Sequence, residues 1–172
     1  MTATPRFLLV FGGLLALAFG LELTPWVQAW LVVPWTDGVA RLSGALMRMF
    51  DASITTTGNV IATTRGAFAV AIEAGCNGVE AMLVLAAAML AFPARWRHRL
   101  AGIAVGAAAV QLLNVVRVVS LFYLGQWNQQ VFEWAHLYVW QALIMLDVLI
   151  VWVIWVRIAG GRASLADDAL PA

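Results

Sequence analysis

The sequence predicts an all-α integral membrane protein with about four transmembrane helices, and two observations carry that prediction. The first is composition: the 172-residue chain is 63% hydrophobic and 11% charged, with a mean hydropathy of +0.90, whereas a soluble domain is about half apolar and about a quarter charged. The second is patterning. Long apolar segments occupy about residues 7–24, 77–93, 100–124 and 137–156, and about 20 apolar residues are enough for a helix to cross a bilayer.

These segments divide a single membrane domain, residues 1–172, into four parts. Residues 1–24 are expected to form an anchor helix and residues 25–75 an extracytoplasmic segment. Residues 76–157 form the helical core, which holds the candidate catalytic residues, and residues 158–172 form a cytoplasmic tail.

Arginines set the expected orientation of the helices. They collect before the first apolar segment, between the second and third, and after the fourth, and the cytoplasmic side of a membrane is the side enriched in Lys and Arg. We therefore predict a multi-pass protein of the cytoplasmic (inner) membrane, with both termini in the cytoplasm. The residues concerned are Arg6, Arg95, Arg97, Arg99, Arg157 and Arg162.

Two small elements are expected in the extracytoplasmic segment. The stretch "TDGVARLSGALMRMF", residues 36–50, has a helical apolar period with Thr36 or Asp37 as N-cap. It predicts an amphipathic helix lying along the membrane surface. The stretch "ASITTTGNVIATTRGAFAVAIEAG", residues 52–75, is rich in β-branched residues and interrupted by Gly-containing turn signals. It predicts a small β-hairpin.

Composition also limits the partners and cofactors. A net charge of +1 gives no reason to expect nucleic acid, so membrane lipid is the expected surrounding partner. The single cysteine excludes an internal disulfide, a CxxC redox pair and a thiolate metal cage. With two histidines, His98 and His136, the sequence predicts neither a metal site nor a cofactor.

Three residues from different segments are expected to meet near the outer face of the membrane: Cys76, Arg117 and His136. A thiolate is a strong nucleophile. Cys76 is expected at the N-terminus of the second apolar helix, near Arg117 or a protonated His136, and we therefore expect its pKa to lie below that of an ordinary thiol. His136 is suited to take the thiol proton and return it to a leaving group. Arg117 is suited to hold an oxyanion, and an arginine inside a membrane segment suggests a functional site by default.

Supporting roles fall to Asn77, Glu80 and Asn114. Glu80 lies one helical turn after Cys76 and is expected to pair with Arg117, while Asn114 shares a helix face with Arg117. Each candidate also has a plain structural interpretation. A lone cysteine is often an inert apolar residue, and Arg117 could serve only as the charge partner of Glu80.

At these positions the sequence resembles the exosortase/archaeosortase family of membrane transpeptidase-like proteases, and most of all exosortase H. The resemblance rests on "GCNGVEAM", residues 75–82, "QLLNVVRVVSLF", residues 111–122, and "WAHLYVW", residues 134–140. It places the family's cysteine on Cys76, with Asn77 as a motif neighbour. It places the family's Asn-x-x-Arg step on Asn114 and Arg117 and the family's histidine on His136.

The resemblance implies a sortase-like cysteine protease or transpeptidase. Its substrates would be exported proteins with a C-terminal sorting signal: a short motif, a transmembrane helix and a basic end. Cleavage at the outer face of the membrane would pass through a Cys76 thioester, and the acceptor could be water or an amine. Two other classes remain open: a non-enzymatic assembly protein, and a small proton-coupled transporter that uses Glu80, Arg117 and Asp147.

Overall fold

A computed structural model describes residues 3–66 and 68–167 of the chain, with side chains up to residue 159. The elements in chain order are α1 (Ala3–Glu22), α2 (Pro25–Val27), the π-helical turn η1 (Gln28–Val32), α3 (Val33–Arg48), β1 (Ile54–Thr57), β2 (Val60–Thr63), β3 (Ala69–Ala71), α4 (Val79–Ala91), α5 (Trp96–Trp127), α6 (Gln129–Trp134), the π-helical turn η2 (Ala135–Val139) and α7 (Trp140–Asp167).

The expected all-α membrane architecture is confirmed, with a qualification about helix length. Within the described part of the chain, three stretches are long and apolar enough to cross a membrane: Thr4–Glu22, Trp96–Trp127 and Gln129–Ala159. The remaining apolar segment forms α4, whose 13 residues span about 20 Å at 1.5 Å per residue. Helix α4 is therefore shorter than the hydrocarbon core, and α1, α5 and α7 lie against it.

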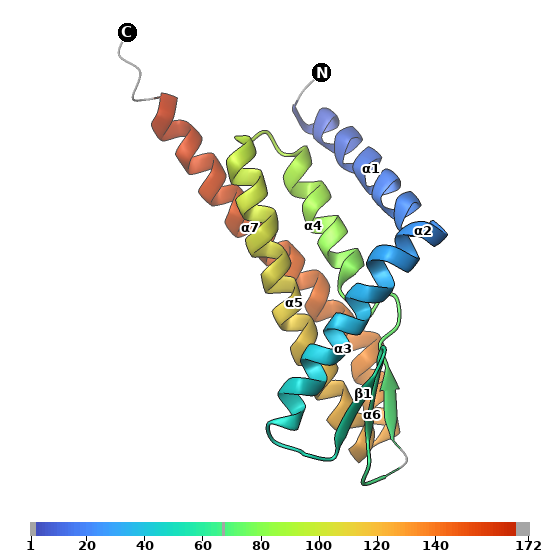
Figure 1. Ribbon diagram of the computed structural model, residues 1–172. Helices are drawn as coiled ribbons and strands as arrows, with labels where there is room; N and C mark the ends of the chain where they lie inside the picture. The colour runs from blue at the N-terminus through green and yellow to red at the C-terminus, as the bar shows by residue number, and fades with distance from the viewer. Residues whose placement is uncertain (1–2, 67, 168–172) are drawn as a thin grey trace.

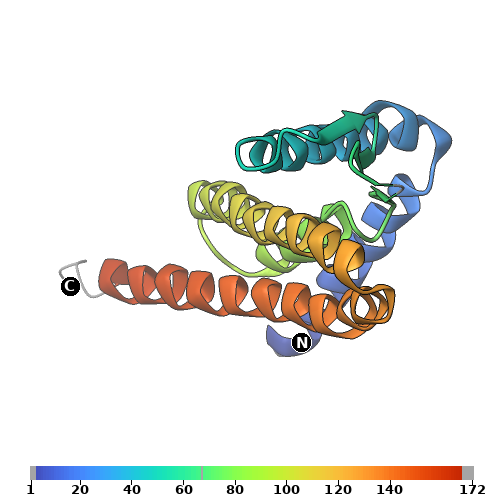
Figure 2. The same cartoon turned by 90° about the horizontal axis from the view of Figure 1, so that it is seen from below.

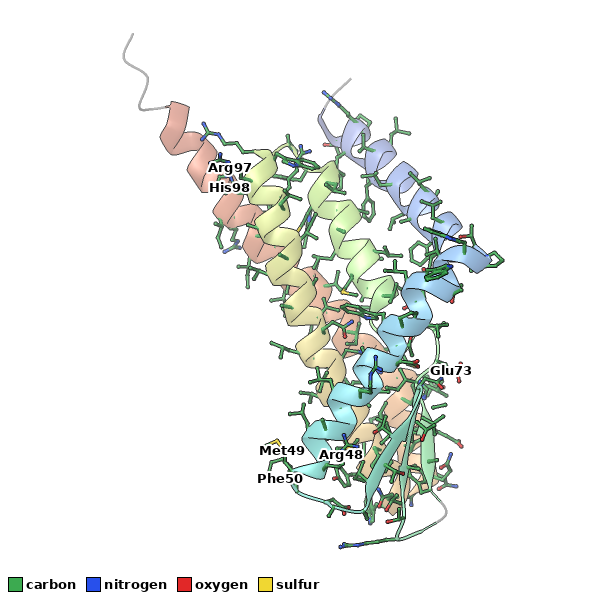
Figure 3. The ribbon with its side chains drawn as sticks, viewed as in Figure 1. Arg48, Met49, Phe50, Glu73, Arg97 and His98 are labelled. Carbon is green, nitrogen blue, oxygen red and sulfur yellow. The ribbon has the colours of Figure 1, made fainter. Side chains whose placement is uncertain are left out.

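The molecule has two distinct ends, which Figure 1 shows at the top and bottom of the view. The upper end, here called the basic end, holds the start of α1, the turn between α4 and α5, and the last part of α7. The lower end, called the sheet end, holds the three strands and α6. Figure 3 labels Arg97 and His98 at the basic end and Arg48 near the sheet end. The helix α7 continues beyond residue 157 to Asp167, and residues 168–172 of the expected tail lie outside the described residues.

Apolar packing forms a separate core in each half. At the sheet end, α3 and the strands pack on the later part of α5 around Met47, Ile61 and Phe122. Toward the basic end, α4, α5 and α7 pack around Leu85 and Val110, and Trp155 joins this core. Figure 2, seen from below, shows α3 and the sheet on one side of α5 and α7 on the other.

The amphipathic helix is present, but it begins before the expected cap. Helix α3 continues from η1 and starts at Val33, so Thr36 is already inside it, and its hydroxyl donates to the Val32 carbonyl at 2.7 Å. The cap prediction was wrong because "QAWLVVP" continues the helix upstream through Pro34, which is tolerated in a first turn. The buried face of α3 includes Thr36 and Ser43, and the face turns toward α5 and the sheet.

The predicted hairpin is extended by a third strand. Strands β1 and β2 pair antiparallel with Thr57 opposite Val60, and β3 pairs antiparallel with β2. The extra strand forms because Val60 to Ala62 have a second free edge, which residues 69–71 fill.

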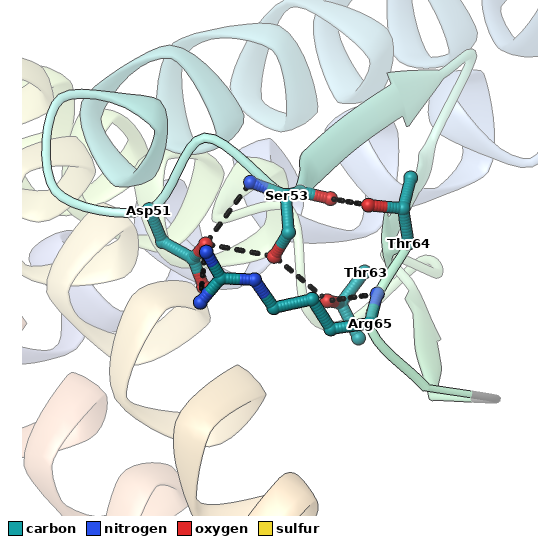
Figure 4. Close-up of polar contacts among 5 residues, drawn as sticks. All are labelled: Asp51, Ser53, Thr63, Thr64 and Arg65. Atoms are coloured by element: carbon teal, nitrogen blue, oxygen red, sulfur yellow. Dashed lines mark hydrogen bonds and ion pairs between the residues drawn. The ribbon is translucent and has the colours of Figure 1, made fainter.

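Polar contacts close the base of this sheet, as Figure 4 shows. Ser53 donates to Asp51 Oδ1 through its amide at 3.0 Å and through its hydroxyl at 2.7 Å. The same hydroxyl lies 3.0 Å from Thr63 Oγ1, and Arg65 Nη1 lies 4.0 Å from Asp51 Oδ1. The two Ser53 hydrogen bonds hold the pKa of Asp51 below its ordinary value, and Arg65 adds to this effect.

Candidate active site

The candidate nucleophile lies on a short loop between β3 and α4. Gly75 (φ 82°) and Gly78 (φ 80°) both adopt left-handed backbone conformations on either side of the Cys76–Asn77 step. Glycine accepts this geometry without a Cβ clash. Cys76 lies between these two glycines, and its amide donates to the Glu73 carbonyl at 2.9 Å.

The three predicted catalytic side chains meet at the sulfur. Cys76 Sγ lies 3.1 Å from His136 Nε2 and 3.3 Å from Arg117 Nη2. The three residues come from the loop before α4, from η2 and from α5. Arg117 and His136 are 41 and 60 positions away from Cys76 in the chain, so only the packing of the helices brings the three side chains together.

A π-helical turn places His136. The turn η2 lies between α6 and α7 and inserts an extra residue into the helical repeat, an irregularity that is common at functional sites. The buried Ala135 packs with Leu121 of α5 and fixes the turn against the bundle. The Phe132 ring meets the imidazole edge-on, with the ring centroids 5.6 Å apart.

Arg117 reaches the loop from well inside α5. The helix runs on for ten residues to Trp127, about 15 Å at 1.5 Å per residue. Arg117 is only 3% exposed, and Nη1 donates to the Gly75 carbonyl at 3.4 Å. Its Nε has no hydrogen-bond partner among the described residues. The guanidinium therefore holds both the sulfur and the peptide that precedes it.

The resting thiol is less acidic than the sequence suggested. Burial of the sulfur raises the pKa of Cys76 above its ordinary value; Arg117 opposes this effect, while Glu80 and Glu73 add to it. The expectation of a lowered pKa was wrong for two physical reasons. Cys76 lies three residues before α4 begins, outside the first turn where the helix dipole acts, and it is half-buried with carboxylates nearby.

Glu80 does not form the expected ion pair with Arg117, since no Arg–Glu contact within 4.0 Å occurs between them in the described structure. Its Oε1 instead accepts a 2.6 Å hydrogen bond from the Gly75 amide. Arg117 holds the carbonyl of that same residue. The two side chains clamp Gly75, one at its N–H and one at its C=O.

Asn77 and Asn114 are both fully buried, at 0% exposure, and the sulfur's hydrogen bonds in the described structure go to His136 and Arg117 instead. Asn77 Oδ1 accepts from the amide of Val79, the first residue of α4, at 3.0 Å. Asn114 Nδ2 donates to Gln111 Oε1 at 3.3 Å. Both residues belong to the support of the loop.

The sequence analysis assigned no role at the site to Trp35 or Gln111, and it treated Thr36 only as a possible helix cap. Gln111 Nε2 and Trp35 Nε1 both donate to the Asn77 carbonyl, at 2.9 and 3.3 Å. A signal for Gln111 existed: with Asn114 and Arg117 it makes polar positions at i, i+3 and i+6 in an apolar helix. Trp35 carries no comparable signal, because its partner, the Asn77 carbonyl, is 42 positions away in the chain and is reached only through the packing of α3.

Two other ionisable residues stay outside the site. Glu133 is exposed and accepts from Gln129 Nε2 at 3.0 Å, so its carboxylate is engaged within α6. Asp147 lies 11 residues after His136, about 16 Å along the helix at 1.5 Å per residue. Among the described residues, no group of three His, Cys, Asp or Glu side chains is placed to hold a metal ion.

Fold and site together define a polytopic helical membrane protein with a cysteine–histidine–arginine centre at the edge of its bundle. Comparison with known families gives a match to the transmembrane exosortase family (Exosortase_EpsH) over residues 5–158. The chain belongs to that family, which confirms the resemblance seen in the sequence; the likeness to exosortase H lies within it. Comparisons with curated proteins and with solved structures each gave no match.

Proposed function

We propose that this exosortase is a cysteine protease or transpeptidase that removes the C-terminal sorting signal of exported proteins. The observation that carries the proposal is the contact of one sulfur with a histidine nitrogen at 3.1 Å and an arginine nitrogen at 3.3 Å. A nucleophile within hydrogen-bond reach of a base, with a cation beside it, is the arrangement that acyl transfer requires.

Acylation would begin at a neutral thiol, because burial raises the pKa of Cys76. His136 Nε2 takes the thiol proton as Sγ attacks the scissile carbonyl carbon, so that charge separates only during attack. Negative charge then moves from sulfur to the carbonyl oxygen, and Arg117 Nη2, already beside the sulfur, can follow it. When the carbon–nitrogen bond breaks, His136 returns the proton to the leaving amine and a Cys76 thioester remains.

Release of the thioester reverses these steps. Water or an amine loses a proton to His136 as it attacks the thioester carbon, and the sulfur leaves and regains that proton. Water gives a new carboxylate, and an amine gives a new amide bond. Both outcomes use the same three side chains, and the acceptor decides between hydrolysis and transpeptidation.

The decisive experiment is cleavage of a tagged model substrate that carries a short motif, a transmembrane helix and a basic end. Co-expression with the unaltered protein should yield a shortened product. The Cys76→Ala variant should accumulate equally in the membrane and yield none. If the chain were a non-enzymatic assembly protein, Cys76→Ala would be harmless, and an equal product from both proteins would refute the enzyme.

We also propose that the protein lies in the inner membrane and that its sheet end faces away from the cytoplasm. The support for this orientation is the set of arginines at the basic end, since cytoplasmic loops are rich in Lys and Arg. Thr57 is exposed at the end of β1, unlike the buried Ser53. In a Cys76→Ala background, Thr57→Cys should react with an impermeant maleimide in intact cells. Labelling only after lysis would reverse the orientation.

A further inference from the structure

Asn77, the residue that follows the nucleophile, is held at its carbonyl and at both polar atoms of its side chain. Its carbonyl accepts from Gln111 and from Trp35, and its Nδ2 donates to Thr36 Oγ1 at 3.0 Å. Its Oδ1 accepts from the Val79 amide. Side chains of α3 and α5 and the first turn of α4 therefore converge on one fully buried residue.

Two side chains of α5 hold the carbonyls on either side of Cys76. Arg117 binds the carbonyl of Gly75, and Gln111 binds the carbonyl of Asn77. The two are six residues apart, about 9 Å along the helix axis at 1.5 Å per residue. Because a helix is stiff over this distance, α5 fixes the separation of the two carbonyls and hence the position of the sulfur along α5.

The loop is shaped to let Gln111 approach. A Cβ built on Gly78 would lie 2.8 Å from Gln111 Nε2, closer than side chains tolerate. Gln111 Oε1 accepts from Asn114 Nδ2 at 3.3 Å, which orients the amide so that its nitrogen faces the Asn77 carbonyl.

We propose that Gln111, supported by Trp35 and Thr36, is a positioning residue for the nucleophile. It does not touch the sulfur; it holds the Asn77 peptide, and so keeps Cys76 against Arg117 and His136. The inference rests on the proposed function for its meaning in catalysis. Its chemical consequence for the thiol can be measured without any substrate.

Gln111→Met tests this role, because it keeps the length of the side chain and removes both polar atoms of the amide, Oε1 and Nε2. We expect kcat for cleavage to fall about tenfold to hundredfold with KM unchanged, since a displaced nucleophile slows the reaction more than it weakens binding. The matched control is Gln126→Met, the same change at an exposed position of α5. It should leave kcat unaltered.

The second measurement is how far Arg117→Met shifts the pH midpoint of Cys76 alkylation. In the otherwise unaltered protein, loss of the cation should raise the midpoint, because Arg117 favours the thiolate. In the Gln111→Met background the shift should shrink to less than half, because the sulfur no longer sits beside the guanidinium. If Gln111 served only the stability of the fold, Gln111→Met would lower the stability of the protein and leave the shift caused by Arg117→Met unaltered.

A Gln111→Met protein with unaltered kcat and the full Arg117 shift would overturn the proposal, whatever its stability. If no cleavage is seen even with the unaltered protein, the proposed function fails by itself and the alkylation shift alone decides on Gln111. If Gln111→Met does not accumulate, Thr36→Val takes its place. That change removes the acceptor of the Asn77 amide at nearly constant volume, and it is judged by the same two quantities.

Discussion

Arg117 and Asp147 are both ionisable residues within apolar helices, and their surroundings differ. Arg117 is buried and donates to the Cys76 sulfur and the Gly75 carbonyl. Asp147 Oδ2 is buried with no hydrogen-bond partner among the described residues. Any ionisable group in a membrane segment suggests function. The polar partners of such a group indicate which function it serves, and here Arg117, with its partners at the thiol centre, is the better supported of the two.

The difference arises from the backbone near each residue. Arg117 faces the non-helical loop of residues 73–78, whose peptide groups need partners that helices do not supply. Arg117, Glu80 and Gln111 supply them. Asp147 sits in the continuous helix α7, where the backbone satisfies itself. Polar side chains thus gather where the chain is irregular, and the nucleophile lies in that irregular stretch.

The largest effect that separates the two residues is expected from Arg117→Lys. Lysine keeps the charge but lacks the planar fork that binds the Gly75 carbonyl and the sulfur together. Loss of one oxyanion donor costs about 10²–10³ in rate. We expect cleavage of the model substrate to fall by that factor in a blot, with near-normal accumulation in the membrane.

The matched control is Arg157→Lys, an exposed position in the second half of α7. It should cleave as the unaltered protein does. An Arg117→Lys protein that accumulates and cleaves at the unaltered rate would assign Arg117 to structure and leave Cys76 and His136 as the proposed machinery.

A pair of changes at Glu80 should have smaller effects and distinguishes a hydrogen bond from a charge pair. Glu80→Gln keeps an oxygen for the Gly75 amide, so cleavage should stay within a few-fold of normal. Glu80→Met removes the acceptor and should lower stability by about 1 kcal/mol, the net worth of a typical hydrogen bond. Thermal unfolding and cleavage assays measure both. If Glu80→Gln were as harmful as Glu80→Met, the negative charge rather than the acceptor would be what matters.

The thiol itself should titrate above an ordinary cysteine. Because burial raises the pKa of Cys76, the midpoint of alkylation should lie above about 8.5. The folded protein then keeps a proton that the unfolded chain releases, so stability should fall as pH rises from the ordinary thiol pKa through the folded one. Cys76→Ala should remove that part of the pH dependence. A midpoint below 8.5 would mean that Arg117 outweighs burial.

Much of this architecture was readable from the sequence, and the limits have physical causes. Apolar length predicted the helices, and ordered motifs predicted that Cys76, Arg117 and His136 meet. The contacts of Glu80 and Trp35 were not predictable, since they depend on a loop bent by two left-handed glycines and on the crossing of α3 over α5. The pKa of Cys76 was misjudged because burial is a property of packing, which local sequence does not reveal.

Asp147→Asn is the smallest expected effect and the one that most directly tests the comparison. The change keeps the shape of the side chain and removes its ability to carry charge. Because Asp147 lies about 16 Å along the helix from His136 at 1.5 Å per residue, cleavage by this variant should stay close to that of the unaltered protein. A proton-coupled transporter would instead depend on Asp147 and tolerate Cys76→Ala. If Asp147→Asn reduced cleavage as strongly as Arg117→Lys, the carboxyl group would have to act on the thiol centre through α7, and the distinction between the two residues would fail.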